Sequence, residues 1–237
     1  MLRCAALQPC AEHFFTEATL HLHGDEREWA SVAGFAGLSP GGLRLLHQVH
    51  GRTVAEASAA ERERWQRPEA DAVISDDPSV ALVVRVADCA PLLIADRRLG
   101  VVAAVHAGWR STMRRIAAAA IEALANAYGS DAGDLVVAIG PSLGACCGEM
   151  GEDVVEAFRR EGHGQAALDA WFDRAPGRRP RFDLWRANRD QLVQAGVRPD
   201  AIHLSRLCTR THAGVFHSYR AVGQQAGRMA AVIRANP

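Results

Sequence analysis

The chain of 237 residues contains no lysine, so arginine alone carries its side-chain positive charge outside histidine. Lys+Arg and Asp+Glu both total 27, and the formal net charge is zero. A balanced chain lacks the electrostatic footprint of a protein that binds nucleic acid or an anionic membrane surface, and we expect neither partner. The missing lysine, beside abundant alanine, indicates compositional drift in a GC-rich genome rather than a functional signal.

Long hydrophobic runs are also missing. The longest, residues 80–86 and 101–105, have the length of strands and fall far short of a membrane span. The N-terminal residues 1–4 lack the extended apolar segment of a secretory signal. These absences predict a cytoplasmic protein, in which the six cysteines are thiols or metal ligands rather than disulfides.

What is present is enough apolar sequence, 49% of the chain, to bury a sizeable core. Apolar runs predict strands at residues 43–49, 71–75, 80–86, 91–95, 101–106, 134–139 and 201–204. Helical spacing predicts helices at residues 112–128, 153–160, 184–194 and 222–234. We expect residues 1–40 to be irregular, 59–66 to form a short charged helix or loop, and 161–181 to form a surface connection.

Capping residues define the ends of two of these helices. Ser111 or Thr112 is the expected N-cap of the helix at 112–128, and Gly129 its C-terminal stop. Asp183 is the expected cap of the helix at 184–194. No repeat and no long linker divides the chain, so we expect one domain over residues 1–237.

A hairpin brings the first chemically interesting pair together. If residues 96–100 form its loop, the centre lies near Arg98 and antiparallel pairing sets Cys89 opposite Ala107, beside His106. Thiolate and imidazole are both preferred ligands of zinc. A catalytic zinc site needs three protein ligands and an open position. His50, which ends a strand and precedes a glycine, is the candidate third ligand.

Other interpretations of these residues stay open. Each could be a packed core residue, or Cys89 could be a nucleophile with His106 as its base. Asp88 could act as a general base or as a partner of a ligand. Cys146 and Cys147 could belong to a second metal site or be small buried residues.

An anion site is predicted next to the hairpin. Arg110 stands beside the expected helix start at Ser111 and Thr112, where free N–H groups and the helix dipole favour phosphate. The alternative is an ordinary strand-to-helix turn with a solvated arginine. Trp109 is either a core residue or a stacking platform.

Several short stretches occur in a fixed order from roughly residue 43 to the C-terminus: His47-Gln48-Val49-His50-Gly51, Ala87-Asp88-Cys89-Ala90-Pro91, His106-Ala107-Gly108-Trp109-Arg110, Ile139-Gly140-Pro141, Asp183-Leu184-Trp185, Ala187-Asn188-Arg189, Cys208-Thr209, Ser218-Tyr219-Arg220 and Gly227-Arg228. Taken together, they resemble a known family, the laccase-domain or multicopper polyphenol oxidase family. Its members are also described as purine nucleoside phosphorylases and peptidoglycan editing factors.

The resemblance implies a fold, a metal and an activity. The fold is α+β (mixed α/β), with mixed β-sheets in the interior and helices outside. The implied zinc ligands are His50, Cys89 and His106, and copper is the metal implied by the older oxidase name. The implied reactions are phosphorolysis of adenosine, inosine and methylthioadenosine and deamination of adenosine, with purine nucleosides and phosphate as small-molecule partners.

Within that framework we assign roles to the remaining polar residues. Asp88 and Arg110 are the predicted catalytic residues, and Gln48, Arg110, Ser218 and Arg220 the predicted substrate-binding residues. A cysteine-type amide hydrolase acting on cell-wall precursors, a copper oxidase of phenols, and a binding protein with a structural zinc are the alternatives.

The sequence departs from the family pattern at several positions. Ser111 replaces a usual glycine, Gly148 a usual aromatic residue and His217 a usual phenylalanine. The N-terminal segment is short, and residues 19–25 are its nearest remnant of the family's pattern. The three metal ligands are all present, so these departures bear on the pocket that selects the substrate.

Overall fold

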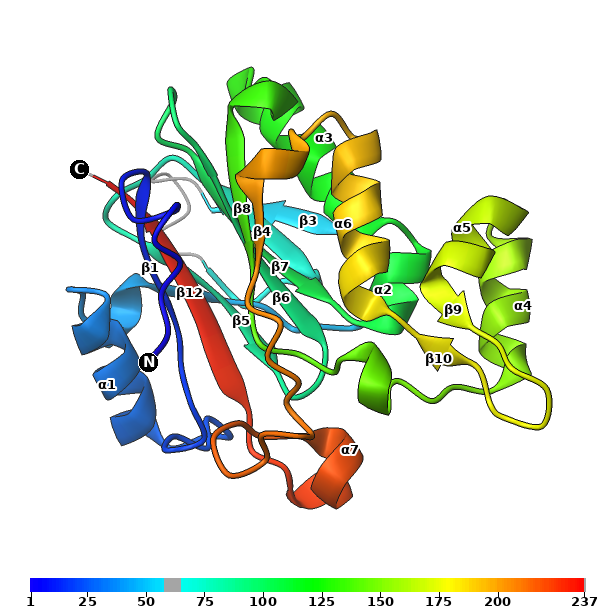
Figure 1. The fold of residues 1–237 in the computed structure, drawn as a ribbon. Coiled ribbons are helices and arrows are strands. Elements are labelled where there is room, and N and C mark those ends of the chain that lie inside the picture. Colours follow the sequence, from blue (N-terminus) through cyan, green and yellow to red (C-terminus); the bar gives the residue numbers. More distant parts are fainter. Residues whose placement is uncertain (58–64, 237) are drawn as a thin grey trace.

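The computed structural model describes residues 1–57 and 65–236 (Figure 1). Its strands are β1 (Ala11–Phe15), β2 (Leu43–Leu45), β3 (Val54–Glu56), β4 (Ala72–Ser75), β5 (Ala81–Val86), β6 (Ala90–Asp96), β7 (Val102–Ala107), β8 (Leu135–Ile139), β9 (Phe172–Asp173), β10 (Arg181–Phe182), β11 (Ile202–Leu204) and β12 (Met229–Ala235). Its α-helices are α1 (Glu26–Phe35), α2 (Trp109–Met113), α3 (Ile116–Tyr128), α4 (Glu152–Arg160), α5 (Gln165–Trp171), α6 (Leu184–Gln194) and α7 (Tyr219–Val222).

Two mixed sheets form the interior. The smaller has the strand order β1-β12-β5-β2, and the larger has the order β11-β8-β6-β7-β4-β3. Strands β5 and β12 of the smaller sheet pack on β6 and β7 of the larger one. A short antiparallel hairpin, β9 with β10, stands apart from both sheets with α4 and α5 beside it (Figure 1).

The central strands are buried on both faces, and alternate side chains enter different cores. On β7, Val102 and Ala104 lie between the two sheets, whereas Ala103 and Val105 face the helices. Helices α3 and α6 cover the outer face of the larger sheet, and α1 covers that of the smaller sheet (Figure 1). The result is a layered α/β/β/α arrangement, so the expectation of interior sheets and outer helices is confirmed.

Two expectations about the secondary structure near the ends of the chain are wrong. Residues 1–40 are not irregular, because they contain β1 and α1, whose cap Asp25 accepts a hydrogen bond from the Arg27 N–H at 2.8 Å. Residues 229–235 form a strand and not the end of a helix over 222–234, because β12 pairs with β1 on one side and β5 on the other. In a short run of buried apolar residues, the spacing of the apolar side chains does not distinguish a strand from a helix.

The expected surface connection at 161–181 is also more ordered than predicted. It contains α5, β9 and the start of β10. Helix α5 forms because Leu168 and Trp171, one helical turn apart, are both buried. The expected strand at 43–49 stops at Leu45, and β3 was not predicted. The element expected at 59–66 lies almost entirely outside the described residues.

The helix expected at 112–128 is two helices, α2 and α3. Arg115 between them has a φ of 61°, a left-handed conformation that interrupts the helical hydrogen bonding. Ser111 and Thr112 therefore lie inside α2 and do not cap it; the N-cap is Gly108. The predicted ends at Gly129, with a φ of 71°, and at Asp183, which accepts from the Arg186 N–H, are confirmed.

The hairpin of β6 and β7 forms with a register one residue away from the expected one. Ala90 pairs with Ala107 and Pro91 with His106, so Cys89 lies at the open end of the hairpin rather than opposite Ala107. A one-residue slip reverses the faces of a strand. Cys89 reaches His106 because it lies in the turn before β6 and is not held by the pairing.

No helix in residues 1–57 and 65–236 has both the length and the apolar character needed to cross a lipid bilayer.

Gly140, directly after β8, packs tightly against both sheets, and its replacement gives a stability test. A Cβ there would overlap the ring of Phe15 on β1 and lie 2.9 Å from Pro91 Cγ on β6. We expect Gly140→Ala to lower the free energy of unfolding by about 1–3 kcal/mol through overpacking. Gly34→Ala, in open space on α1, is the matched control and should be neutral or stabilising. Urea denaturation of both variants measures the difference; equal stabilities would contradict the packing argument.

Candidate metal centre and cleft

The three predicted metal ligands come from separate parts of the fold and meet at the ends of the central strands β6 and β7 of the larger sheet. His50 lies in the turn between β2 and β3, Cys89 in the turn between β5 and β6, and His106 on β7. Their ligand atoms all lie within 4.8 Å of one another. The His50 Nε2 is 3.7 Å from the Cys89 Sγ, and the two imidazole rings are 4.8 Å apart at their centroids.

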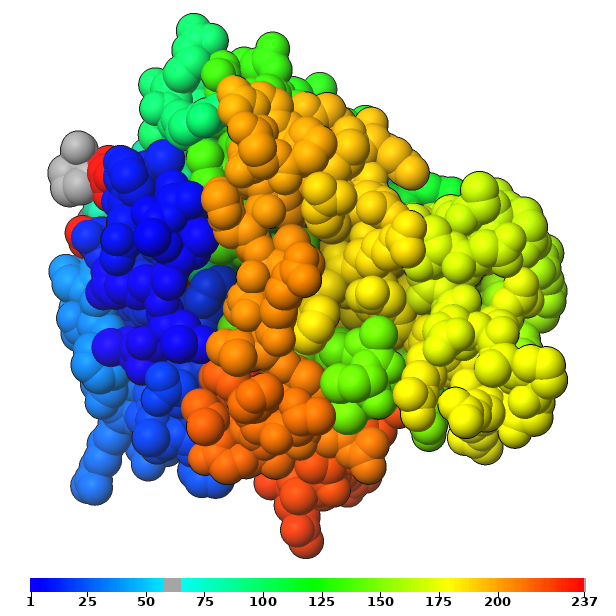
Figure 2. Space-filling model, in the orientation of Figure 1, coloured from blue at the N-terminus to red at the C-terminus, as the bar shows by residue number. Residues whose placement is uncertain are grey.

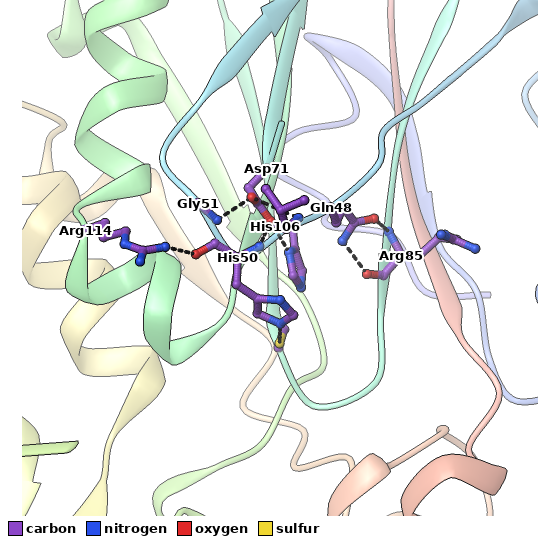
Figure 3. Close-up of polar contacts among 9 residues, drawn as sticks. Gln48, His50, Gly51, Asp71, Arg85, His106 and Arg114 are labelled. Carbon is purple, nitrogen blue, oxygen red and sulfur yellow. Dashed lines mark hydrogen bonds and ion pairs between the residues drawn. The ribbon is translucent and has the colours of Figure 1, made fainter. Parts of the chain in front are cut away.

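The buried carboxylate of Asp71 organises this cluster (Figure 3). Its Oδ1 lies 2.8 Å from His106 Nδ1 and accepts the His50 backbone N–H at 3.0 Å. Its Oδ2 accepts the Gly51 N–H at 2.5 Å. Because Asp71 engages Nδ1 of His106, the Nε2 of that ring is left for a metal. Asp71 was missed at the sequence level, where it was only the start of a predicted strand.

Strand register explains why Asp71 meets His106. In the β4–β7 pair, Ala72 is opposite Val105. One residue further, the His106 N–H donates to the Asp71 carbonyl at 2.7 Å, so the two side chains lie opposite each other across the strands. A carboxylate directly before a buried strand was the available signal, but its partner depends on strand pairing that the sequence pattern did not show.

Two residues at the cluster have left-handed backbone conformations that are uncommon without glycine. His50 has a φ of 58° and Asp88 a φ of 86°. Arg114 donates to the His50 carbonyl at 2.8 Å, and the Leu143 N–H donates to the Asp88 carbonyl at 2.8 Å. Such conformations persist where the surrounding structure imposes them, and they cluster at functional sites.

The pKa values of the thiol and of the His106 imidazole in the cluster are shifted in opposite directions. Burial raises the pKa of the Cys89 thiol, but the nearby His106 and hydrogen bonds from both histidines outweigh burial and lower the pKa to about 6. Burial lowers the pKa of His106, but Cys89 and Asp71 outweigh it and raise the pKa to about 9. Burial also raises the pKa of Asp71, but its hydrogen bonds from His106 and Gly51 leave it below its usual range.

The residues present fit a metal ion. Two imidazoles and one thiolate form a three-ligand donor set of the type found in catalytic zinc sites. Gly108 leaves the room that such an ion requires, because a Cβ there would lie 2.8 Å from Cys89 Sγ and 2.9 Å from His50 Cδ2. Ligation by His50, Cys89 and His106 stays a prediction, now with convergent geometry behind it.

A cleft of about 690 Å³ opens onto the cluster. One wall is apolar and includes Leu143, Met150, Phe182 and Leu184. A second group of lining residues consists of arginines, namely Arg85, Arg110, Arg220 and Arg228. The only carboxylate among the described lining residues is that of Asp88.

The predicted catalytic residue Asp88 lies in the cleft with both carboxylate oxygens engaged. Its Oδ1 accepts the Thr209 hydroxyl at 2.6 Å, and its Oδ2 accepts the Arg220 backbone N–H at 2.6 Å. Asp88 thereby fastens the segment 209–220 to the turn that carries Cys89. Its role in proton transfer stays a prediction.

The predicted substrate-binding residues differ in their access to the cleft. Gln48 lines it, but its amide pairs with the Arg85 backbone through two 2.8 Å hydrogen bonds (Figure 3). Arg220 lines it and donates to the Glu149 carbonyl at 2.9 Å. Ser218 is not among the described lining residues; it is buried and caps α7 through the Ala221 N–H.

The predicted helix-terminal anion site needs correction. Helix α2 begins at Trp109 and has five residues, so Arg110 is its second residue and not a residue before its start. The exposed Arg110 guanidinium lies 4.2 Å from the centroid of the Trp109 ring. Positive charge in the cleft therefore comes from arginine side chains on several segments rather than from a helix dipole.

The departures from the family pattern have structural counterparts. A Cβ at Gly148 would overlap the Phe182 carbonyl, so the chain passes close to β10 at this point of the cleft. His217 Nε2 lies 2.9 Å from the Leu20 carbonyl oxygen and ties the C-terminal segment to the N-terminal one. Ser111 is buried, and its hydroxyl has no hydrogen-bond partner among the described residues.

The fold is that of a mixed α/β protein. Its cleft is lined by arginines and contains a candidate metal centre of two histidines and one cysteine. The sequence profile of the family described as multi-copper polyphenol oxidoreductase laccase matches residues 25–236, and the chain belongs to this family. The family expected from the motifs is thereby confirmed.

Individual relatives agree with this placement. The purine nucleoside phosphorylase of Deinococcus radiodurans is 39% identical over 207 residues, which are 86% of this chain and 74% of that protein. Adenosine deaminase RL5, from an unknown prokaryotic organism, is 36% identical over 159 residues, 67% of this chain and 59% of that protein. The crystal structure of the Bacillus licheniformis protein YfiH matches with a TM-score of 0.82 at 26% identity, covering 93% of this chain and 85% of that one.

The position of Asp71 predicts a specific loss on substitution. Asp71→Asn keeps the shape of the side chain but removes the charge that orients His106 and the 49–51 turn. We expect metal affinity to fall about 10- to 100-fold. Competition with a chromogenic chelator measures this, and Asp200→Asn on the exposed surface is the control. Unchanged affinity in Asp71→Asn would show that the carboxylate does not organise the site.

Gly108 provides a steric test of the same centre. The added methyl group of Gly108→Ala would occupy space between Cys89 and His50. We expect this variant to retain less than about a tenth of the wild-type metal affinity, with a folded core, because the misplaced ligands lose coordination geometry. Metal analysis after dialysis, alongside circular dichroism, checks both parts; full metal content would contradict convergence of the three ligands on one ion.

Proposed function

We propose that this chain is a zinc-dependent purine nucleoside enzyme. It cleaves adenosine, inosine and methylthioadenosine with phosphate and deaminates adenosine to inosine. The names of two relatives, a purine nucleoside phosphorylase and an adenosine deaminase, support this reaction class. The observation that carries the proposal is that the cluster of His50, Cys89 and His106, four arginines and several apolar side chains all line one cleft.

The apolar wall suits a purine base. The half-buried Met150 offers a surface on which a flat heterocycle loses contact with water, and the buried Phe182 and Leu184 belong to the same lining. Trp109 and Tyr219 add aromatic rings to the lining. Aromatic side chains favour stacked or edge contacts with another ring, which orients the ligand as well as burying it.

The arginines suit phosphate. Four guanidinium groups face one carboxylate in the lining, so an anion entering the cleft meets net positive charge. The Arg85 Nε is buried and has no hydrogen-bond partner among the described residues. An unpaired buried donor is costly, and an oxyanion at this position would satisfy it. Phosphate bound here would lie in the same cleft as the base and attack the ribose C1′.

The cluster suits zinc in both reactions. Zinc supplies Lewis-acid chemistry and acidifies water, which the deamination requires. The chain's own residues set this up. Asp71 holds the His106 ring, the left-handed turn at His50 presents its imidazole, and Cys89 contributes a thiol whose pKa is already lowered. His50, Cys89 and His106 would hold the ion.

Incubation of the purified chain with adenosine, with and without phosphate, tests the proposal. We expect adenine and ribose 1-phosphate only when phosphate is present, and inosine in both cases. His106→Ala should abolish both products because it removes a ligand. The absence of adenine and inosine from the wild-type reaction, with one zinc bound per chain, would overturn the assignment.

Arg110 can be tested separately for its predicted role. Because it is exposed and stacks only on Trp109, Arg110→Gln should leave the fold intact. We expect the KM for phosphate to rise about tenfold, the loss of one charge-assisted contact, with little change in deamination. Arg160→Gln, on the exposed end of α4, is the matched control. An unchanged KM for phosphate would remove Arg110 from the anion site.

The Cys89 thiol favours a second candidate, a cysteine-type amide hydrolase. A thiol with a pKa of about 6 beside an imidazole is the arrangement of a nucleophile and its base. The two candidates separate on the metal. Under the proposed function, Cys89→Ala loses zinc and chelation abolishes activity, whereas a hydrolase would be inactivated by thiol alkylation of the metal-free chain and be indifferent to chelators.

A further inference from the structure

A second group of sulfur atoms lies outside the centre described above. Cys146 and Cys147 end a short 3-10 turn, Ala145–Cys147, and Cys208 belongs to a segment more than sixty residues later in the chain. A parallel bridge between Ser142 and Cys208 joins the two segments, with the Thr209 N–H donating to the Ser142 carbonyl at 3.1 Å. In Figure 2 the green turn lies at the surface beside the orange segment.

The three sulfurs lie close together, and one pair has the spacing expected in a coordination shell. All three Sγ atoms lie within 4.8 Å of one another, and those of Cys146 and Cys147 are 3.7 Å apart. Two thiolates bound about 2.3 Å from one tetrahedral ion are about 3.8 Å apart. The adjacent residues thus already have the separation that a shared ion would impose.

Packing alone does not account for this arrangement. Cys147 and Cys208 are 8% and 4% exposed, but Cys146 is exposed to solvent. Apolar Leu143 and the partly buried Trp185 pack against the buried pair. Two buried cysteines would hold an ion away from water, and the exposed third cysteine would let the ion enter from solvent. Three thiols also cannot all be closed by a disulfide, since one is always left over.

We propose that Cys146, Cys147 and Cys208 form a second metal site that binds a soft cation, cuprous copper, through three thiolates. The histidine, cysteine and acidic residues that the described chain groups here are all cysteines, and soft thiolate ligands select Cu(I) or zinc. Zinc in structural sites takes four ligands. Three sulfurs with no histidine, carboxylate or fourth cysteine in the group therefore favour Cu(I), and each thiol that binds releases its proton to solvent.

The site is connected to the cleft from both of its segments. The Cys147 carbonyl accepts a hydrogen bond from Arg220 at 3.2 Å, and Arg220 lines the cleft. Thr209, which follows Cys208, donates to Asp88, which precedes Cys89. An ion that ties Cys147 to Cys208 would brace this wall of the cleft. The inference does not depend on the proposed function, because no step of it uses the nucleoside chemistry.

The experiment uses the full chain carrying Cys89→Ser, which removes the only sulfur ligand of the first candidate centre. Under anaerobic conditions, Cu(I) is titrated against a chromogenic Cu(I) chelator, and X-ray absorption counts the sulfur neighbours of the bound copper. We expect one Cu(I) per chain with three sulfur neighbours. Adding Cys208→Ser or Cys146→Ser should lower the affinity at least tenfold, whereas adding Cys10→Ser, a half-buried cysteine elsewhere, should leave it unchanged.

Cys146→Ser keeps the test decisive if the buried Cys208→Ser variant fails to fold, because Cys146 is exposed. Equal affinities in the Cys146→Ser and Cys10→Ser variants would overturn the proposal, as would bound copper with fewer than three sulfur neighbours. A parallel zinc titration completes the test. Retention of zinc with no retention of Cu(I) would overturn the assignment of a cuprous site.

Discussion

A single buried carboxylate, that of Asp71, determines the geometry of the candidate metal centre. A charge removed from water must be fully hydrogen-bonded, and Asp71 meets this requirement with the His106 ring and the backbone of residues 49–51. The same contacts orient the candidate ligand His106 and position the turn that carries the candidate ligand His50. Because both side chains depend on Asp71, the candidate centre cannot be divided into independent parts.

The two-sheet core supplies the rigidity that this arrangement needs. Left-handed backbone at His50 and Asp88 is unfavourable in a free chain, and each of these residues is held by a hydrogen bond to its carbonyl. Strands β6 and β7, buried on both faces, present the neighbouring ligands from the middle of the larger sheet. The left-handed backbone at His50 and Asp88 thus lies in turns next to well-packed central strands.

The cleft is assembled from segments that contribute different chemistry. The ends of strands β6 and β7 contribute the thiol of Cys89 and the imidazole of His106. The segments around Arg220 and Arg228 contribute positive charge, and the β9–β10 hairpin contributes Phe182. Asp88 links the first two through its hydrogen bonds to Thr209 and Arg220. The proposed sulfur site adjoins the cleft through the hydrogen bonds of Arg220 to the Cys147 carbonyl and of Thr209 to Asp88.

The sequence by itself determined the family, the three candidate ligands, most interior strands and the ends of helices at Gly129 and Asp183, since motif spacing, apolar runs and caps are local properties of the chain. Only the tertiary structure decided what depends on partners. Pairing on both sides makes residues 229–235 a strand although their composition also suits a helix, and the register of β4 with β7 places Asp71 against His106. The tertiary structure also decided the register of the β6–β7 hairpin and the proximity of Cys147 to Cys208. Both depend on hydrogen bonds between separate segments of the backbone, which no local sequence pattern shows.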